Sequence, residues 1–312
     1  MMRVALMHRR LAGGGTETDL RRLAAGLTTR RHDVHVFCAR PGPVPPGVTL
    51  RRVPVVRGGR LARLVSFAFA APRLVARERW DVVVGFHRAI LWLERRQFAP
   101  GGHRRVLAVS ARVRDEVAGD YGVPRERMAV IYNGVDAERF HPAGRPVLGP
   151  LVRRELGVED GMRLCVAIGT GFRRKGFDLL LALWRTAAPA HTVLALVGGD
   201  ERLGAYRREA SRLAGRVVVT GPREDVVPLL AAADVVCAPS RQEAFGNVVL
   251  EACAAGVPVP EDLDALGAAL ARALGPEGPS FGRAARRLAE RLPWDAHLER
   301  VETLFAEVAR ER

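Results

Sequence analysis

Short runs of β-branched and other apolar residues alternate along the chain with longer stretches in which apolar residues recur at helical spacing. The short runs are typical of buried parallel strands and the longer stretches of amphipathic helices. The predicted strands are residues 3–7, 33–38, 81–85, 105–109, 128–131, 163–168, 192–197, 216–220, 234–238 and 257–259. The predicted helices are residues 17–30, 61–79, 176–188, 202–213 and 245–255. Two such series predict an α/β protein with two Rossmann-like domains, each a doubly wound parallel sheet.

The segment 140–146 marks the predicted domain boundary, because it is rich in proline and glycine and poor in apolar residues. We therefore predict an N-terminal domain over residues 1–142 and a C-terminal domain over residues 143–294. A further helix is predicted near the C-terminus, over residues 295–310.

Composition supports a folded chain, since 312 residues of which 48% are hydrophobic can build two cores. No apolar run approaches the roughly 18 residues that a membrane span needs. The first ten residues lack the long apolar core of a signal peptide. The four cysteines include no C-x-x-C pair, so we expect buried thiols in a reducing compartment rather than disulfides or zinc. These features favour a cytoplasmic protein.

The net charge of +15 favours an anionic partner, whether nucleic acid, an acidic membrane surface or a phosphorylated substrate. The basic residues are spread along the chain without any nucleic-acid recognition motif, which disfavours nucleic acid. Nearly all of them are arginine, and the single lysine is Lys175.

Ligands of open parallel sheets bind beyond the carboxyl ends of the strands, so the loops that follow strands are the places to look for chemistry. The first such loop carries Gly13, Gly14 and Gly15 ahead of a helix, where backbone N–H groups can approach an anion. The loop is not G-x-G-x-x-G, and Arg40 rather than an acid follows the second strand, which disfavours a dinucleotide. A plain tight turn explains the glycines equally well.

A second glycine-flanked loop, residues 169–176, carries Arg173, Arg174 and Lys175. Three cations at the mouth of a sheet suit a diphosphate, and lysine supplies a flexible point charge where arginine supplies a planar fork. The alternative is a solvated basic turn. The uniqueness of the lysine favours the phosphate-binding role.

The stretch 245–255 predicts a buried helix, apolar on nearly every face except at Asn247 and Glu251. A buried carboxylate is costly without polar partners, and the hydroxyls of a sugar or ribose would supply them. The amides of Gly246 and Asn247 at the helix start can meet a phosphate. A structural glutamate paired within the protein is the alternative.

Glu243 and Glu251, eight residues apart around Phe245, Gly246 and Asn247, resemble the E-x7-E motif of the retaining GT-B glycosyltransferases of family 4. Further matches follow the family's order and cover most of the chain: residues 13–15, 133–136, 173–176, 230–235 and 251–259. Within the family, residues 13–19, 84–86 and 172–176 are similar to lipopolysaccharide core glucosyltransferases.

The resemblance implies two Rossmann-like domains facing each other across a cleft, with residues 295–312 packing back on the first domain. It implies transfer of a hexose, with glucose from UDP-glucose expected, onto a lipopolysaccharide core or related glycan acceptor. No cofactor, no metal and no nucleic acid are expected. The implied catalytic residues are Asp19, Arg174, Lys175 and Glu243, and the implied donor-binding residues are Gly14, Gly15, Arg173, Phe245, Gly246, Asn247 and Glu251.

The implied roles follow from leaving-group chemistry. Arg174 and Lys175 would stabilise the negative charge that builds on the departing diphosphate. Glu243 would hold the hydroxyls of the transferred sugar and Glu251 those of the ribose, while Asp19 would lie near the acceptor. The Asp-Leu-Asp at 262–264 is expected to cap a helix, and His87 is either a base beside the cleft or a plain loop histidine.

Two segments of the family pattern are missing, one after Phe86 and one after Val259. A degenerate GT-B protein that binds a nucleotide sugar without efficient transfer therefore stays open. Arginines also mix with apolar residues over 61–79. This stretch is either a packed helix with solvated arginines or a surface that docks on the anionic inner face of the cytoplasmic membrane.

Overall fold

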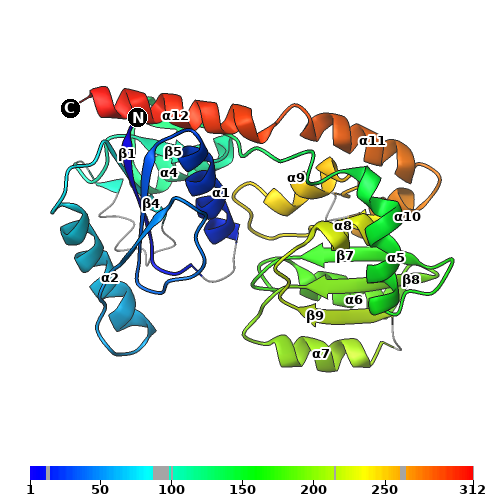
Figure 1. Ribbon diagram of the computed structural model, residues 1–312. Helices are drawn as coiled ribbons and strands as arrows, with labels where there is room; N and C mark the ends of the chain where they lie inside the picture. Colours follow the sequence, from blue (N-terminus) through cyan, green and yellow to red (C-terminus); the bar gives the residue numbers. More distant parts are fainter. Residues whose placement is uncertain (12–14, 87–97, 100, 214–215, 261–264, 312) are drawn as a thin grey trace. The chain divides into compact units, whose positions relative to one another are not determined.

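A computed structural model describes residues 1–11, 15–86, 98–99, 101–213, 216–260 and 265–311 (Figure 1). The chain divides into two compact units, Met1–Tyr132 with Asp295–Arg312, and Asn133–Trp294. The division after Tyr132 comes before the segment 140–146, which the sequence analysis took as the boundary.

The first unit is built on a parallel sheet in the order β3-β2-β1-β4. Val4 on β1 pairs with Val34 on one side and with Val82 on the other. The strands are β1 (Arg3–His8), β2 (Asp33–Cys38), β3 (Thr49–Arg52) and β4 (Val82–Phe86), with β5 (Val106–Ala108) and β6 (Met128–Val130) forming a separate parallel pair. The helical segments are α1 (Gly15–Thr29), α2 (Arg60–Val75), α4 (Ala111–Tyr121), η1 (Arg125–Arg127) and α12 (Trp294–Arg310).

Helices cover both faces of this sheet. Leu298, Val301 and Leu304 of α12 join one core cluster together with residues of α1. A Cβ on Gly26 of α1 would lie 2.6 Å from Leu298 Cδ2, so the glycine makes room for the terminal helix. Phe67 of α2 is buried in the cluster on the other face.

The second unit repeats the plan with strand order β10-β7-β8-β9. Its strands are β7 (Arg163–Ile168), β8 (Thr192–Val197), β9 (Val217–Gly221) and β10 (Val235–Val236). Its helical segments are η2 (Pro142–Gly144), α5 (Arg145–Glu155), α6 (Phe177–Ala187), α7 (Leu203–Ser211), α8 (Val227–Ala232), α9 (Asn247–Ala254), α10 (Leu266–Leu274) and α11 (Gly278–Ala289). Every residue of β8 is buried, and core clusters lie on both faces of the sheet. The two parallel sheets with their covering helices confirm the predicted α/β class.

One expectation about local structure was wrong. Residues 257–259 do not form a strand. Val236 N donates to Pro258 O at 3.0 Å, but Pro258 and Pro260 have no N–H with which to complete a ladder. Within the segment 140–146, α5 starts at Arg145, and Pro146 occupies its first turn, where a missing N–H costs nothing.

Two further properties of the described residues bear on function. Cys38, Cys165, Cys237 and Cys253 are buried and free, as predicted. Within the described ranges, no helix is long and apolar enough to cross a membrane.

Candidate functional site

The basic loop between β7 and α6 is held by glycines that no other residue could replace without a shift. Gly176 has a φ of +71°, and a Cβ there would collide with the carbonyl oxygen of Pro239 in the loop after β10. Gly198, with a φ of +139°, packs against the carbonyl oxygen of Gly169 in the same way. The loops that follow β7, β8 and β10 are therefore in contact through their backbones at the carboxyl edge of the sheet.

Lys175 and Glu243, which lie 68 residues apart in sequence, form an ion pair at this edge. The lysine stem runs along Gly169, where a Cβ would lie 2.8 Å from Lys175 Cε. Only 14% of the Lys175 side chain and 30% of the Glu243 side chain are exposed. Ser240 Oγ donates to Glu243 Oε2 at 3.5 Å. The only lysine of the chain is thus brought to the carboxylate of the predicted motif.

The two arginines beside Lys175 differ in their surroundings. Arg173 is exposed, whereas Arg174 donates to the carbonyl oxygens of Thr170 at 3.0 Å and Gln242 at 3.1 Å. Because these acceptors are main-chain atoms, the position of the Arg174 guanidinium is set by the two loops together. Arg174 also receives a hydrogen bond at its own carbonyl, from Arg241 N at 2.9 Å.

Arg241 and Asp178 complete this network, and the sequence analysis missed both. Arg241 donates to Arg173 O at 2.6 Å and forms an ion pair with Asp178 at 2.6 Å. Burial acts to raise the pKa of Asp178, but the hydrogen bond and the charge of Arg241 outweigh it, so that this pKa lies below its ordinary value. Both residues are part of the predicted loop and helix, but no motif distinguishes them from the other charged residues of the chain.

Helix α9 begins directly after Gly246, which has a φ of +90°. A Cβ there would lie in ordinary contact with Glu243 Cγ, at 3.5 Å, so the helix start is at the same edge. Glu251 lies one turn after Asn247 and is only 6% exposed. The preceding Phe245 packs against the core of the unit. The predicted buried helix is confirmed, although it starts at Asn247 rather than at residue 245.

Both ends of α9 are tied to the start of the second unit. Asn133 Nδ2 donates to Asn247 Oδ1 at 2.7 Å at the first turn. At the last turn, one nitrogen of Arg286 donates to Ala254 O at 2.5 Å and to Phe140 O at 2.9 Å. Asn133 belongs to the segment 133–136 of the family resemblance, whereas no motif in the sequence distinguishes Arg286 from the other arginines.

The remaining candidates lie elsewhere. Asp19 is a partly exposed residue of α1 in the first unit, and so it is not among the side chains that the second unit brings together. Gly15 is the first residue of α1. Gly14, His87 and the segment 262–264 lie outside the described residues. Nowhere in the part of the chain that the structure describes do three or more His, Cys, Asp or Glu side chains cluster as a metal would require.

Two family models match the chain. The model described as "Glycosyl transferases group 1" matches residues 163–259, which include the loop of Lys175 and the motif that holds Glu243 and Glu251. The model described as "Glycosyltransferase Family 4" matches residues 13–101 and 84–139. Together the matched ranges cover most of both units.

Curated relatives include lipopolysaccharide glucosyltransferase WaaG of Escherichia coli K12, which is 25% identical over 284 residues, or 79% of this chain and 76% of that protein. A D-inositol 3-phosphate glycosyltransferase of Thermomonospora curvata is 34% identical over 175 residues, or 51% of this chain and 41% of that protein. The second match therefore spans less than half of that relative.

Solved structures agree over nearly the whole chain. The crystal structure of WaaG, described as a glycosyltransferase involved in lipopolysaccharide biosynthesis, has a TM-score of 0.84 at 22% identity and covers 97% of this chain and 99% of its own. Anabaena HepE in complex with UDP and glucose has a TM-score of 0.78 at 17% identity, covering 98% and 100%. These likenesses show the fold, which is the predicted GT-B class.

Proposed function

Because this chain belongs to the family 4, or group 1, glycosyltransferases, we propose that it transfers glucose from UDP-glucose to a lipopolysaccharide core or related glycan, with retention at the anomeric carbon. Glycosyltransferase activity follows from the family. The donor is proposed from HepE, which is in complex with UDP and glucose, and the acceptor from the relative WaaG, a lipopolysaccharide glucosyltransferase.

The contact between Lys175 and Glu243 carries the proposal. It joins the one lysine of a glycine-flanked basic loop to the first carboxylate of the E-x7-E segment, beside the start of α9. In the reaction, the bond between the anomeric carbon and the β-phosphate oxygen breaks, and the acceptor oxygen bonds to that carbon on the same face. The electron pair of the broken bond stays on the β-phosphate oxygen of UDP, and the proton of the acceptor hydroxyl passes to the departing diphosphate as the new bond forms.

Lys175 and Arg174 would supply fixed positive charge where negative charge develops on the diphosphate. Glu243, which already sits within reach of Lys175, would accept hydrogen bonds from the sugar hydroxyls, and Glu251 would accept those of the ribose. Gly246 and Asn247 would offer N–H groups at the helix start, with Arg173 on the solvent side of the phosphates. Phe245, packed in the core, would fix this helix start.

On the first unit, Asp19 would contact the acceptor, and Gly14 and Gly15 would let α1 approach the donor closely. With cations of the chain facing the diphosphate, the scheme needs no metal. Activity should therefore survive excess EDTA, and a loss restored by Mg²⁺ or Mn²⁺ would contradict the scheme.

The decisive experiment is a transfer assay with UDP-, GDP- and ADP-sugars and a truncated lipopolysaccharide core, in which the product anomer is identified by NMR. Transfer from UDP-glucose with retention is expected. Binding of UDP-glucose without transfer would show instead a degenerate member that keeps the donor site.

We also propose a cytoplasmic location with peripheral docking on the anionic inner face of the membrane. On α2, Phe67 is buried, but Leu61 is 60% and Phe69 is 37% exposed, so part of its apolar surface faces solvent beside arginines such as Arg73. Binding to anionic vesicles that falls steeply with salt is expected. Equal binding to neutral and anionic vesicles would rule out this mode.

A further inference from the structure

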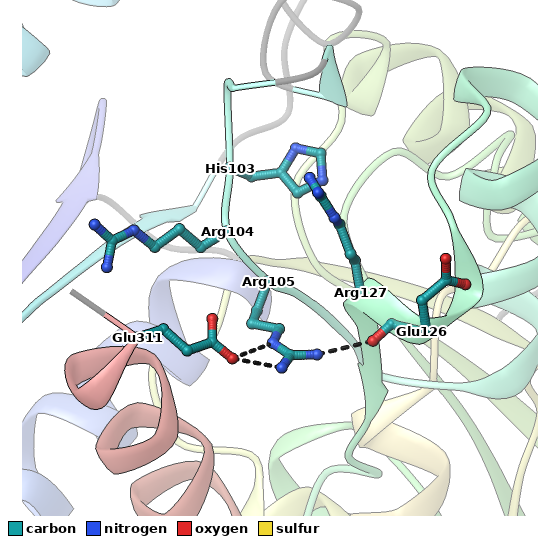
Figure 2. A pocket seen from close by; sticks show the side chains of 6 residues that line it. All are labelled: His103, Arg104, Arg105, Glu126, Arg127 and Glu311. Carbon is teal, nitrogen blue, oxygen red and sulfur yellow. Dashed lines mark hydrogen bonds and ion pairs between the residues drawn. The ribbon is translucent and has the colours of Figure 1, made fainter.

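A cavity of about 570 Å³ lies in the first unit, at the amino ends of β5 and β6. Its lining residues directly precede these strands or follow α12: His103, Arg104, Arg105, Glu126, Arg127 and Glu311 (Figure 2). The proposed glycosyl transfer takes place at loops that follow the carboxyl ends of strands. This cavity is at the other end of its strands, so it is a separate feature of the molecule.

Arg105 forms the fixed wall of the cavity. Two of its nitrogens bond Glu311 Oε1, at 3.1 and 2.5 Å, and a third donates to Glu126 O at 2.8 Å. The Arg105 and Glu311 charges therefore neutralise each other, and their contact joins the end of α12 to the residues that precede β5 and β6.

Arg104 and Arg127 supply charge that this pair does not use. Among the described residues neither has an ion pair or a side-chain hydrogen bond. In Figure 2 the Arg127 side chain extends toward the ring of His103, Arg104 reaches out on the opposite side of Arg105, and the Glu126 carboxylate is turned away from the His103 ring. With one carboxylate set against two arginines, the cavity keeps a positive charge.

From this geometry we propose that the cavity binds a phosphate monoester, held by the fork of Arg127, by His103 and by Arg104. A planar guanidinium pairs two N–H groups with two phosphate oxygens, and a second cation on the opposite wall meets the remaining charge. The volume lies within the range of small-molecule sites and exceeds what inorganic phosphate needs. The phosphate therefore belongs to a larger molecule, either a soluble phosphorylated metabolite or a lipid headgroup.

The test is a titration of the ¹⁵N-labelled full chain with glycerol 3-phosphate in the presence of saturating UDP, followed by NMR. Shifts are expected at residues 103–108, at 126–130 and at 311. In the double variant R104Q/R127Q the affinity at these residues should fall about tenfold or more, because two charge-assisted contacts are lost. The control R208Q/R212Q removes two exposed arginines of the second unit, neither of which forms an ion pair among the described residues. It should bind glycerol 3-phosphate with the affinity of the unchanged chain.

A parallel measurement with phosphatidylcholine vesicles, with and without phosphatidic acid, distinguishes the two sources. Vesicle binding that needs both phosphatidic acid and the two arginines supports a headgroup. A soluble ester is supported if R104Q/R127Q weakens the binding of glycerol 3-phosphate but leaves vesicle binding unchanged. Since both arginines are exposed, the thermal unfolding midpoint of R104Q/R127Q should match that of the control. The proposal is overturned if neither probe depends on the arginines, if the control loses as much, or if shifts occur only at residues 169–176.

Discussion

The carboxyl edges of the two sheets differ in the contacts that join their loops. In the first unit the loops after β1 and β2 are joined by backbone hydrogen bonds, Leu11 N to Arg40 O at 3.0 Å and Ala39 N to Arg9 O at 3.1 Å. In the second unit the loops after β7 and β10 are also joined by a backbone hydrogen bond, Arg241 N to Arg174 O at 2.9 Å, and in addition by charged side chains, of which Lys175 and Glu243 are one pair. Backbone bonds tolerate many side chains, whereas an ion pair requires particular ones. The same topology therefore carries, in the second unit, an edge at which particular charged residues add to the backbone bonds.

The largest effect that tests this contrast is expected from Lys175→Ala. Removing one preorganised charge at a developing anion should lower turnover roughly 10²-fold or more at saturating donor. Steady-state transfer from UDP-glucose measures it, and Arg208→Gln, an exposed arginine on α7, serves as a control that should leave turnover unchanged. Unchanged turnover in Lys175→Ala would remove the distinction between the two edges.

The second edge was more accessible to sequence analysis because its side chains belong to motifs. Glu243 and Lys175 could be chosen from their neighbours in sequence. Three strands, 33–38 in the first unit and 163–168 and 192–197 in the second, were also predicted with their observed bounds. Mostly apolar runs of this kind specify strands that are buried over most of their length.

Other features could not be predicted because the sequence carries no local signal for them. Strand β3 is a mostly exposed edge, Thr-Leu-Arg-Arg, that pairs with β2 in parallel register and carries two arginines where an apolar run would be expected. The partners Arg241 and Asp178 are 63 residues apart, and only the folded chain brings them together. The prediction of a strand over 257–259 was wrong, because a pattern of apolar residues carries no information on whether each residue has an N–H, and proline has none.

A structural test of the same contrast compares two glycines. Gly176→Ala should destabilise the second unit by about 2 kcal/mol or more, because alanine is strained at a positive φ and its Cβ collides with Pro239. Gly59→Ala in the first unit, where nothing lies within 4 Å of the added Cβ, should change stability by less than about 0.5 kcal/mol. Urea unfolding measures both. Equal effects would mean that the close contact between the loops of β7 and β10 does not exist.

The two carboxylates of the second edge should separate in calorimetry. Glu251→Gln should weaken both UDP and UDP-glucose about tenfold, the cost of a charged hydrogen bond to ribose. Glu243→Gln should weaken UDP-glucose and spare UDP, because its contact is with the sugar. The reverse pattern would show that the two residues exchange roles and that the buried one faces the hexose.

The smallest effect concerns two imidazoles of the first unit, those of His8 and His297. Burial lowers the pKa of His8 below its ordinary value of 6.5, as do the charges of Arg9 and Arg10, against the opposing charge of Glu17. Burial likewise lowers the pKa of His297. The unfolded chain then binds more protons than the folded one below about pH 6.5, so stability should fall as the pH drops from there through the folded-state pKa values.

The unfolding midpoint of the first unit, followed by NMR signals of β1 and α12, should therefore decrease between pH 7 and pH 5, two values chosen to bracket the ordinary histidine pKa of about 6.5. His8→Gln should reduce the slope of that decrease, since it removes one of the two groups that must take up a proton on unfolding. Arg57→Gln, an exposed change in the same unit, should keep the full slope. A slope that His8→Gln leaves unchanged would assign the whole effect to His297. An unfolding midpoint independent of pH would show that neither His8 nor His297 has a lowered pKa in the folded chain.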